Sequence, residues 1–180
     1  MKFLVISDTH GKIGRAAEIY RKLTDIDVLV HLGDYKRDGQ ELARSFGVDC
    51  FCIRGNMDGS ADGEHGFLYV ECGKILLTHG HGDHVKRGVE GLISTCREED
   101  CKGAFFGHTH IPYLNEIDGI TLLNPGSLSL PRSGRQGSYA IVTTGREGIH
   151  ASILYDSPKG PTKKPQGGYL RSLMNYSDGF

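Results

Sequence analysis

The sequence predicts an α/β protein in which two β-sheets pack face to face and helices cover their outer sides. Three features lead to this prediction. The first third of the chain alternates apolar, strand-like runs with helix-like segments, and the second half is rich in strand pairs joined by short turns. The 180 residues, 38% of them hydrophobic, are enough for one domain with a sizeable core. We therefore expect a four-layer α/β/β/α sandwich.

The first third predicts a mostly parallel sheet. Residues 2–7, KFLVIS, form an aliphatic run that ends at a polar loop, as expected for a buried strand. Apolar residues then recur at helical spacing within 13–24. The same alternation predicts a strand, a helix and a strand at 27–33, 38–46 and 48–55. Strands separated by short helices favour parallel pairing in a sheet that is covered on both faces.

Turn residues in the second half predict antiparallel hairpins. One hairpin is expected around 72–74, followed by a helix over 85–98 and a strand in GAFFGH, residues 103–108. Two more hairpins are expected around 118–119 and 145–148. The second half is therefore richer in antiparallel pairs than the first.

The closing residues differ in composition from the rest. Residues 156–168, DSPKGPTKKPQGG, are rich in Pro, Gly and Lys, so we expect a flexible linker after a domain that spans 1–155. Apolar residues recur at helical spacing within 169–180. This segment predicts either a short helix, docked on the domain or on a second copy in a homo-oligomer, or a frayed tail.

Charge and composition give no sign of a nucleic-acid or membrane partner. The formal net charge of −1 provides no global basic field for nucleic acid. The apolar run near the N-terminus is too short for a signal peptide or a membrane span, so we expect a cytoplasmic protein. The five cysteines are odd in number and lack C-x-x-C spacing, which favours buried, reduced thiols.

Histidines and other polar residues gather just after the strand-like runs. FFGHTH at 105–110 and LLTHGHGDH at 76–84 each place two or three imidazoles in a loop. In an α/β sheet, the loops at the carboxyl ends of parallel strands converge on one edge, where ligands bind. Seven oxygen and nitrogen donors from five segments are therefore expected to meet: Asp8, His10, Asp34, Asn56, His79, His108 and His110.

The chemical types of these donors indicate a metal centre. Carboxylates and imidazoles without thiolates suit Mn²⁺, Fe, Zn²⁺, Co²⁺ or Ni²⁺. Seven donors are too many for one catalytic ion that keeps an open position, whereas one bridging carboxylate would give two ions four protein ligands each. Two ions about 3.5 to 4 Å apart can clamp both oxygens of a phosphoryl displacement. In the triplets at 8–10 and 108–110, an extended backbone would direct both donors to one side.

Each donor also has an ordinary structural alternative. Asp and Asn after a strand often cap the next helix, and a histidine is more often a core or surface residue than a ligand. The complete set of seven favours metal ligation. Outside that set, we expect His31 to pack in the core or to support a ligand. His81 and His84 are candidates for substrate contact or ligand support, whereas His65 and His150 should be exposed.

Five blocks of the sequence resemble, in order, the motifs of the calcineurin-like metallophosphoesterases. The family pattern is D-x-H, G-D, G-N-x-D/E, H-G and G-H-x-H, and the matching blocks are SDTHG, HLGDY, RGNMDG, LTHGHGDH and FGHTH. The resemblance spans about residues 1–155 and is nearest to the small bacterial and archaeal phosphodiesterases of the YfcE type. Five motifs in order are specific, although any one alone is weak. LLNPGSLSLPRSG at 122–134 also resembles the family's N-P-G-S loop near the metals, with an ordinary Pro-Gly turn as the alternative.

The resemblance implies a fold, a ligand set and an activity. The family fold has two mixed sheets sandwiched between helices. Two divalent ions, manganese first among the candidates, would be bound in two groups of ligands that share Asp34 as the bridge. The first group is Asp8, His10, Asp34 and His110, and the second is Asn56, His79, His108 and Asp34. A hydroxide shared by the metals would attack the phosphorus of a small phosphodiester. Phosphomonoesterase action and a non-catalytic scaffold like the related retromer subunit are the alternatives.

The third block departs from the family in one position. Many members carry a histidine after the asparagine, where it assists the leaving group, but this chain has Met57 between Asn56 and Asp58. A missing general acid removes about 10²- to 10⁴-fold of rate, and least where the leaving group is already good. We therefore expect a preference for activated esters. Asp58 of the same block, His81 and His10 are the further candidates for catalytic roles, and the two histidines are the candidates to replace the missing acid.

Overall fold

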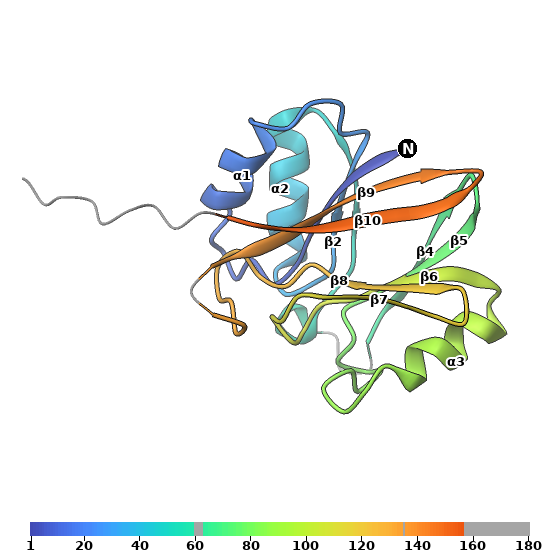
Figure 1. The fold of residues 1–180 in the computed structure, drawn as a ribbon. Helices are drawn as coiled ribbons and strands as arrows, with labels where there is room; N and C mark the ends of the chain where they lie inside the picture. The colour runs from blue at the N-terminus through green and yellow to red at the C-terminus, as the bar shows by residue number, and fades with distance from the viewer. Residues whose placement is uncertain (60–62, 135, 157–180) are drawn as a thin grey trace, which may run out of the picture.

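Two five-stranded sheets lie face to face in the described part of the chain, with helices on their outer sides (Figure 1). The computed structural model describes residues 1–59, 63–134 and 136–156. Helices α1 and α2 lie on one side of the sandwich and α3 lies on the other (Figure 1). The layers are therefore α/β/β/α, and the predicted fold class is confirmed.

The first sheet contains the three parallel strands predicted from the first third of the chain. Its order is β10-β9-β1-β2-β3, with β1, β2 and β3 parallel and β9 antiparallel to both β1 and β10. The strands are β1 (Lys2–Ile6), β2 (Val28–His31), β3 (Asp49–Cys52), β9 (Ser138–Gly145) and β10 (Gly148–Tyr155). The hairpin expected around 145–148 joins β9 to β10.

The second sheet is also mixed. Its order is β4-β5-β6-β8-β7, with parallel pairs β5/β6 and β6/β8 at the centre and antiparallel pairs at both edges. The strands are β4 (His65–Val70), β5 (Gly73–Thr78), β6 (Cys101–Phe105), β7 (Tyr113–Ile117) and β8 (Ile120–Asn124). The hairpins expected around 72–74 and 118–119 form the two edges.

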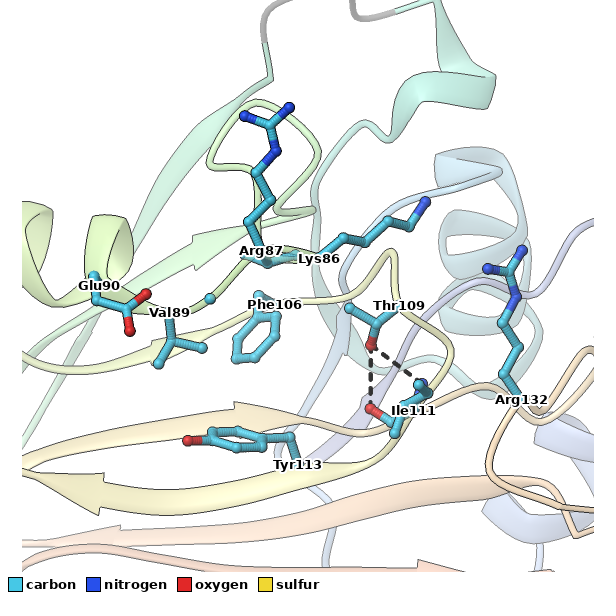
Figure 2. A pocket seen from close by; sticks show the side chains of 11 residues that line it. Lys86, Arg87, Val89, Glu90, Phe106, Thr109, Ile111, Tyr113 and Arg132 are labelled. Carbon is cyan, nitrogen blue, oxygen red and sulfur yellow. Dashed lines mark hydrogen bonds between the residues drawn. The ribbon is translucent and has the colours of Figure 1, made fainter.

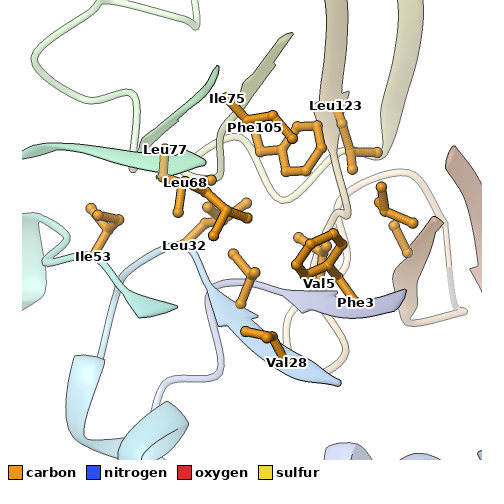
Figure 3. Close-up of a cluster of buried hydrophobic side chains, with 13 residues drawn as sticks. Phe3, Val5, Val28, Leu32, Ile53, Leu68, Ile75, Leu77, Phe105 and Leu123 are labelled. Atoms are coloured by element: carbon orange, nitrogen blue, oxygen red, sulfur yellow. The ribbon is translucent and has the colours of Figure 1, made fainter. Parts of the chain in front are cut away.

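The alternation of side chains along β1 explains why it is apolar at every position. Phe3 and Val5 point into the space between the sheets, where they pack with Leu77 and Phe105 of the second sheet (Figure 3). Leu4 and Ile6 point to the other face and pack beneath α1 (Gly14–Tyr20) and α2 (Lys36–Phe46). Successive residues of a strand face opposite sides, so a strand with both faces covered has no polar side.

A third apolar cluster lies under α3 (Glu90–Glu98) on the outer face of the second sheet. Leu92, Ile93 and Cys96 of this helix pack on Leu76 and other residues of the sheet. The chain therefore has one apolar layer between the sheets and one beneath the helices on each side.

The parallel strands fix where the functional loops leave the sandwich. At the end of β1, Ile6 pairs with His31 of β2, and His31 pairs in turn with Cys52 of β3. In the second sheet, Leu77 pairs with Phe105 at the end of β6, and Phe105 pairs with Leu123. The loops after these strands therefore leave from one edge of each sheet.

The parallel strands are covered on both faces, as predicted, with helices on one face and the second sheet on the other. One detail differs from the predictions. The helix expected over 85–98 begins at Glu90, since Gly88 has a φ of +159° that no helix accommodates and residues 81–87 form turns. The predicted linker beyond Asp156 and the predicted helix or tail at 169–180 lie outside the described residues.

The cysteines match the prediction of reduced thiols. Cys96 and Cys101 are buried and free, and Cys50, Cys52 and Cys72 are half-buried and free. Among the described residues, no helix is long and apolar enough to cross a membrane.

Candidate metal centre

The predicted donors meet where the two sheets end on the same side of the sandwich. Asp8 follows β1 and is fully buried. Its carboxylate Oδ2 accepts hydrogen bonds from the Ser7 hydroxyl (2.6 Å) and from the backbone N–H of His108 (3.1 Å), which follows β6 in the other sheet. A second link between the sheets runs from His79: its Nδ1–H donates to the Leu32 carbonyl at 2.7 Å. The loops of both sheets are therefore tied together at this edge.

Four of the seven donors form one tight cluster. The ligand atoms of Asp8, His10, Asp34 and His110 all lie within 4.8 Å of one another. Two atoms bound at about 2.1 Å to one ion lie at most about 4.2 Å apart, so a small inward movement would bring these four onto a single ion. This cluster is the set that the family resemblance implies for the first ion.

Two of the remaining donors, His79 and His108, lie beside this cluster. His79 Nε2 is 3.4 Å from Asp34 Oδ1, and the rings of His79 and His108 have centroids 5.1 Å apart. Asn56 is exposed at the first residue of the short 3₁₀-helix Asn56–Asp58. Asp34 therefore stands between the two groups, with Oδ2 at 3.7 Å from His10 Nε2 and Oδ1 facing His79. This is the place expected for a bridging carboxylate.

Five of the donors have a left-handed backbone. The φ angles are 55° at Asp8, 48° at His10, 52° at Asp34, 67° at His108 and 59° at His110. Residues other than glycine adopt this region at a cost of about 1–3 kcal/mol each, and such residues concentrate at functional sites. The expectation of extended triplets at 8–10 and 108–110 is therefore wrong. It is the left-handed turns that direct the donors of each triplet into the centre.

Unpaired lone pairs show that the centre fits a cation. His79 and His110 each donate through Nδ1 to a backbone carbonyl, of Leu32 at 2.7 Å and of Leu130 at 2.8 Å. Since each neutral ring carries one proton, Nε2 is left as an acceptor that faces a carboxylate oxygen: Asp34 Oδ1 at 3.4 Å for His79 and Asp8 Oδ1 at 3.2 Å for His110. Asp8 Oδ1 and His79 Nε2 are buried and make no hydrogen bond within the described residues. Acceptors facing acceptors in a buried site need positive charge between them.

The pKa shifts show the same attraction of Asp8 for positive charge. Burial alone would raise the pKa of Asp8, but the imidazoles of His110 and His79 in their protonated forms, together with the Ser7 hydroxyl, bring it below its usual value. The Asp8 carboxylate in turn raises the pKa of His110. Burial, with Lys86 as a smaller contribution, lowers the pKa of His108 to about 4, so this ring is neutral and able to bind a metal at neutral pH.

Glycines in the motifs leave room for the carboxylates. A Cβ on Gly55 would lie 2.2 Å from Asp34 Oδ1, and one on Gly107 would lie 2.1 Å from Ser7 Oγ and 2.9 Å from Asp8 Oδ2. Gly55 precedes Asn56 and leaves space for Asp34, and Gly107 precedes His108 and leaves space for Asp8. Only glycine allows the backbone to approach this closely.

A buried network behind the centre holds the loop of Asp8 and His10. The backbone N–H of Gly33 donates to His31 Nδ1 (3.3 Å), so Nε2 carries the proton and donates to the Thr9 hydroxyl at 2.9 Å. The Thr9 hydroxyl then donates to Asp38 at 2.7 Å, and Asp38 also accepts from Gly11 N–H at 2.7 Å. His31 therefore supports the loop that carries the ligands, which is one of the two roles predicted for it. Thr9 and Asp38 were missed in the sequence, although an acidic residue at the start of a predicted helix signals a structural carboxylate.

Asp58 lies beside the centre, but its carboxylate is occupied by backbone groups. It accepts from the N–H groups of Tyr35 (3.1 Å), Lys36 (2.9 Å) and Gly55 (2.9 Å). These bonds hold the Asn56 loop against the start of α2. Asp58 is thus placed as a positioning residue, while the other further candidate, His81, has its ring centroid 5.4 Å from that of His79 and 6.0 Å from that of His108.

The loop after β8 completes the centre. The hydroxyls of Ser127 and Ser129 each donate to the Asp8 carbonyl at 2.9 Å, and Asn124 donates from its side chain to the Gly107 carbonyl at 2.7 Å. The N-P-G-S stretch is therefore both a turn and a direct support of the donors. Buried carboxylates and imidazoles held in this way form a site of the kind found in metal-dependent hydrolases.

Comparison with known proteins identifies the family. Residues 1–147 match the calcineurin-like phosphoesterase superfamily domain. A probable metallophosphoesterase of Mycoplasma genitalium is 35% identical over 136 residues, which cover 74% of this chain and 80% of that protein. The phosphodiesterase YfcE of Escherichia coli is 27% identical over 168 residues, covering 79% of this chain and 87% of YfcE. The chain belongs to the calcineurin-like phosphoesterase superfamily, and the resemblance of the five motifs is confirmed.

Solved structures share the fold. A predicted phosphoesterase from Streptococcus pneumoniae is 26% identical, with a TM-score of 0.67 over 86% of this chain and 97% of that one. Vps29 of Entamoeba histolytica, solved in complex with zinc, is 21% identical, with a TM-score of 0.66 over 86% of this chain and 99% of that one. The second likeness concerns the fold alone.

The support network gives a testable dependence of stability on pH. Burial lowers the pKa of His31 to about 4, against about 6.5 in an unfolded chain. At a pH between these two pKa values, His31 binds a proton in the unfolded chain but stays neutral in the folded chain. The free energy of unfolding therefore decreases as the pH falls through this range. Between pH 7 and 5 this residue should lower the free energy of unfolding by about 2 kcal/mol.

The substitution His31→Gln should remove that loss, because Gln keeps a donor for Thr9 and does not titrate. We expect the loss of stability between pH 7 and 5, measured by urea unfolding with excess chelator, to be about 2 kcal/mol smaller in this variant than in the wild type. His150→Gln, which changes an exposed histidine of β10, is the control and should keep the wild-type loss. Equal losses in all three proteins would contradict the buried neutral state of His31.

Proposed function

We propose that the protein is a binuclear metal-dependent phosphodiesterase. One observation carries the proposal: acceptor atoms of Asp8, Asp34, His79 and His110 face one another, and Asp8 Oδ1 and His79 Nε2 are buried with no hydrogen bond among the described residues. Family membership supports phosphoester hydrolysis as the reaction. The name of the relative YfcE, a phosphodiesterase, favours a diester as the substrate.

Two sets of side chains would hold the ions. The first is the cluster of Asp8, His10, Asp34 and His110, and the second is Asn56, His79 and His108 with Asp34 shared. Divalent ions bound there would activate water and withdraw negative charge from the phosphoryl group. Carboxylates and imidazoles suit manganese, iron, zinc, cobalt or nickel, and the family resemblance puts manganese first among them.

The chain's own residues keep these donors ready before substrate binds. The Leu32 and Leu130 carbonyls fix the proton of each imidazole on Nδ1, so that Nε2 stays available in the centre. Ser7 and the His108 N–H hold Asp8 Oδ2, which leaves Oδ1 for an ion. Donors fixed in this way need little reorganisation during the reaction.

The leaving group receives little help from the third motif. Met57 is 56% exposed and cannot donate a proton, and its backbone N–H is used by Asp34 Oδ1 at 2.9 Å. His81 and His10 are the nearby imidazoles that can replace the absent acid. Esters with good leaving groups are therefore the preferred substrates in this proposal.

Replacing the bridging carboxylate should abolish turnover. With added Mn²⁺ the wild type should hydrolyse bis(p-nitrophenyl) phosphate, and chelation should stop the reaction. Asp34→Asn keeps the acceptor for Met57 but removes the charge, so we expect a loss of kcat/KM of about 100-fold or more. Asp49→Asn, at the exposed start of β3, is the control and should keep wild-type activity.

Two outcomes of this assay would decide against the proposal. Turnover that survives chelation, or Asp34→Asn at the wild-type rate, would show that the centre does not carry the reaction. The same preparation, given p-nitrophenyl phosphate, tests the alternative of a phosphomonoesterase. A higher kcat/KM on the monoester would replace diester specificity with monoester specificity.

A scaffold role is the rival proposal from another class, and the likeness to Vps29 in fold is the observation that favours it. The retained donors argue against it. The segment 169–180 would be the contact element, so deleting 156–180 should change the oligomeric mass in solution if the protein assembles through it. For a catalytic domain we expect an unchanged mass and unchanged hydrolysis, measured by light scattering and by the assay above.

A further inference from the structure

A pocket of about 500 Å³ opens beside the metal centre, on the side of α3 (Figure 2). It lies between the turn before α3, the end of β6 and the loop that leads into β7. Among the described residues, its lining combines apolar side chains with three cationic ones: Val85, Val89, Phe106, Ile111, Tyr113, Lys86, Arg87 and Arg132. None of these has a role in the metal centre proposed above.

The pocket is directly connected to the ligands. Thr109, which lines it, is the residue between the donors His108 and His110. The backbone N–H of Arg132 donates to the His110 carbonyl at 3.2 Å, and Ile111 N–H donates to the Thr109 hydroxyl at 3.2 Å. The pocket therefore borders the loop that carries His108 and His110.

The inner part of the pocket is apolar and aromatic. The rings of Phe106 and Tyr113 have centroids 6.1 Å apart at an angle of 53°, and Val89 lies beside them (Figure 2). Phe106 and Val85 are buried, so these walls are fixed by the core of the protein. At this spacing the two rings contact each other, so with Val89 they form one apolar surface on which a flat ring is favoured over a polar chain. Pockets of this volume hold organic groups up to the size of a drug molecule.

The outer part of the pocket carries positive charge toward the centre. Figure 2 shows the side chains of Lys86 and Arg132 extending beyond Thr109 on the same side, whereas Arg87 points away from the two rings. Glu90, the acidic residue among the described lining, lies beside Val89 on the side away from Arg132 (Figure 2).

We infer that this pocket selects the substrate: it binds the organic arm of a phosphoester when that arm carries a flat aromatic group, while Lys86 and Arg132 attract the phosphoryl group to the ions. The inference rests on the proposed function, which it deepens by naming the substrate class as aryl or heteroaryl phosphoesters. Small alkyl esters would bind through the phosphoryl group alone, because they cannot reach both rings.

Two phosphonates measure the contribution of the pocket without turnover. Phenylphosphonate and methylphosphonate carry the same anionic head and differ only in the arm, and their C–P bond resists hydrolysis. In calorimetric titrations of the Mn²⁺-loaded full chain, phenylphosphonate should bind about tenfold more tightly or better, because its ring is buried against Phe106 and Tyr113. Equal dissociation constants would overturn the inference.

Filling the pocket should remove the preference. Ile111 lines the pocket and is 47% exposed, so Ile111→Trp places a large ring there with little disturbance of the core. Its matched control is Leu114→Trp, which changes a similarly exposed (42%) apolar residue of β7 outside this pocket. We expect the phenyl preference to disappear in the first variant and to remain in the second. A preference that survives Ile111→Trp would place the ring elsewhere and overturn the inference.

The cationic side chains should affect binding of the phosphonate group and not of the organic substituent. Lys86→Met is expected to weaken both phosphonates by a similar factor of about five, whereas Lys102→Met, at an exposed lysine of β6 outside this pocket, should leave both unchanged. If Lys86→Met changed neither dissociation constant, the assignment of Lys86 would be wrong. Because calorimetry detects binding without turnover, failure of this inference is distinguishable from failure of the phosphodiesterase assay.

Discussion

The Asp8 carboxylate, buried between the ends of the two sheets, is the interaction on which the rest of the site depends. Its oxygen Oδ2 accepts a hydrogen bond from the His108 N–H and so joins the first sheet to the second. The backbone carbonyl of Asp8 accepts hydrogen bonds from two hydroxyls of the loop after β8. The other oxygen, Oδ1, has no hydrogen-bond donor among the described residues. A buried carboxylate in this state is costly unless a cation approaches it. The place where the five motif loops meet therefore requires a nearby positive charge.

This requirement for a cation explains the unusual features of the surrounding loops. Left-handed turns at Asp8, His10, Asp34, His108 and His110 cost backbone strain but aim the donors at one volume. The Nδ1 bonds of His79 and His110 to carbonyls fix each ring with Nε2 inward. Gly55 and Gly107 allow the loops to approach closely enough. Removal of any one of these features would leave the others stabilising an incomplete site.

Much of this arrangement could be predicted from the sequence, for identifiable reasons. The aliphatic run of β1 and the glycine turns predicted the layered architecture, because the sequence signals of strands and hairpins are local. The positions of Asp8, Asp34 and His79 after strands predicted that their side chains gather at one edge, as they do. The start of α3 could not be predicted, since it depends on the backbone angle of Gly88. The backbone role of Asp58 and the pocket beside His110 also escaped prediction, because both arise from contacts between distant loops.

The central claim is that the site holds two ions per chain, with Asp34 between them. Its most direct test is metal analysis of the full chain after loading with Mn²⁺ and removal of the excess by gel filtration, with Asp34→Asn in parallel. We predict two ions per wild-type chain and fewer than one in the variant. A wild-type chain that retains no ion, or a variant that retains as many as the wild type, would contradict the account.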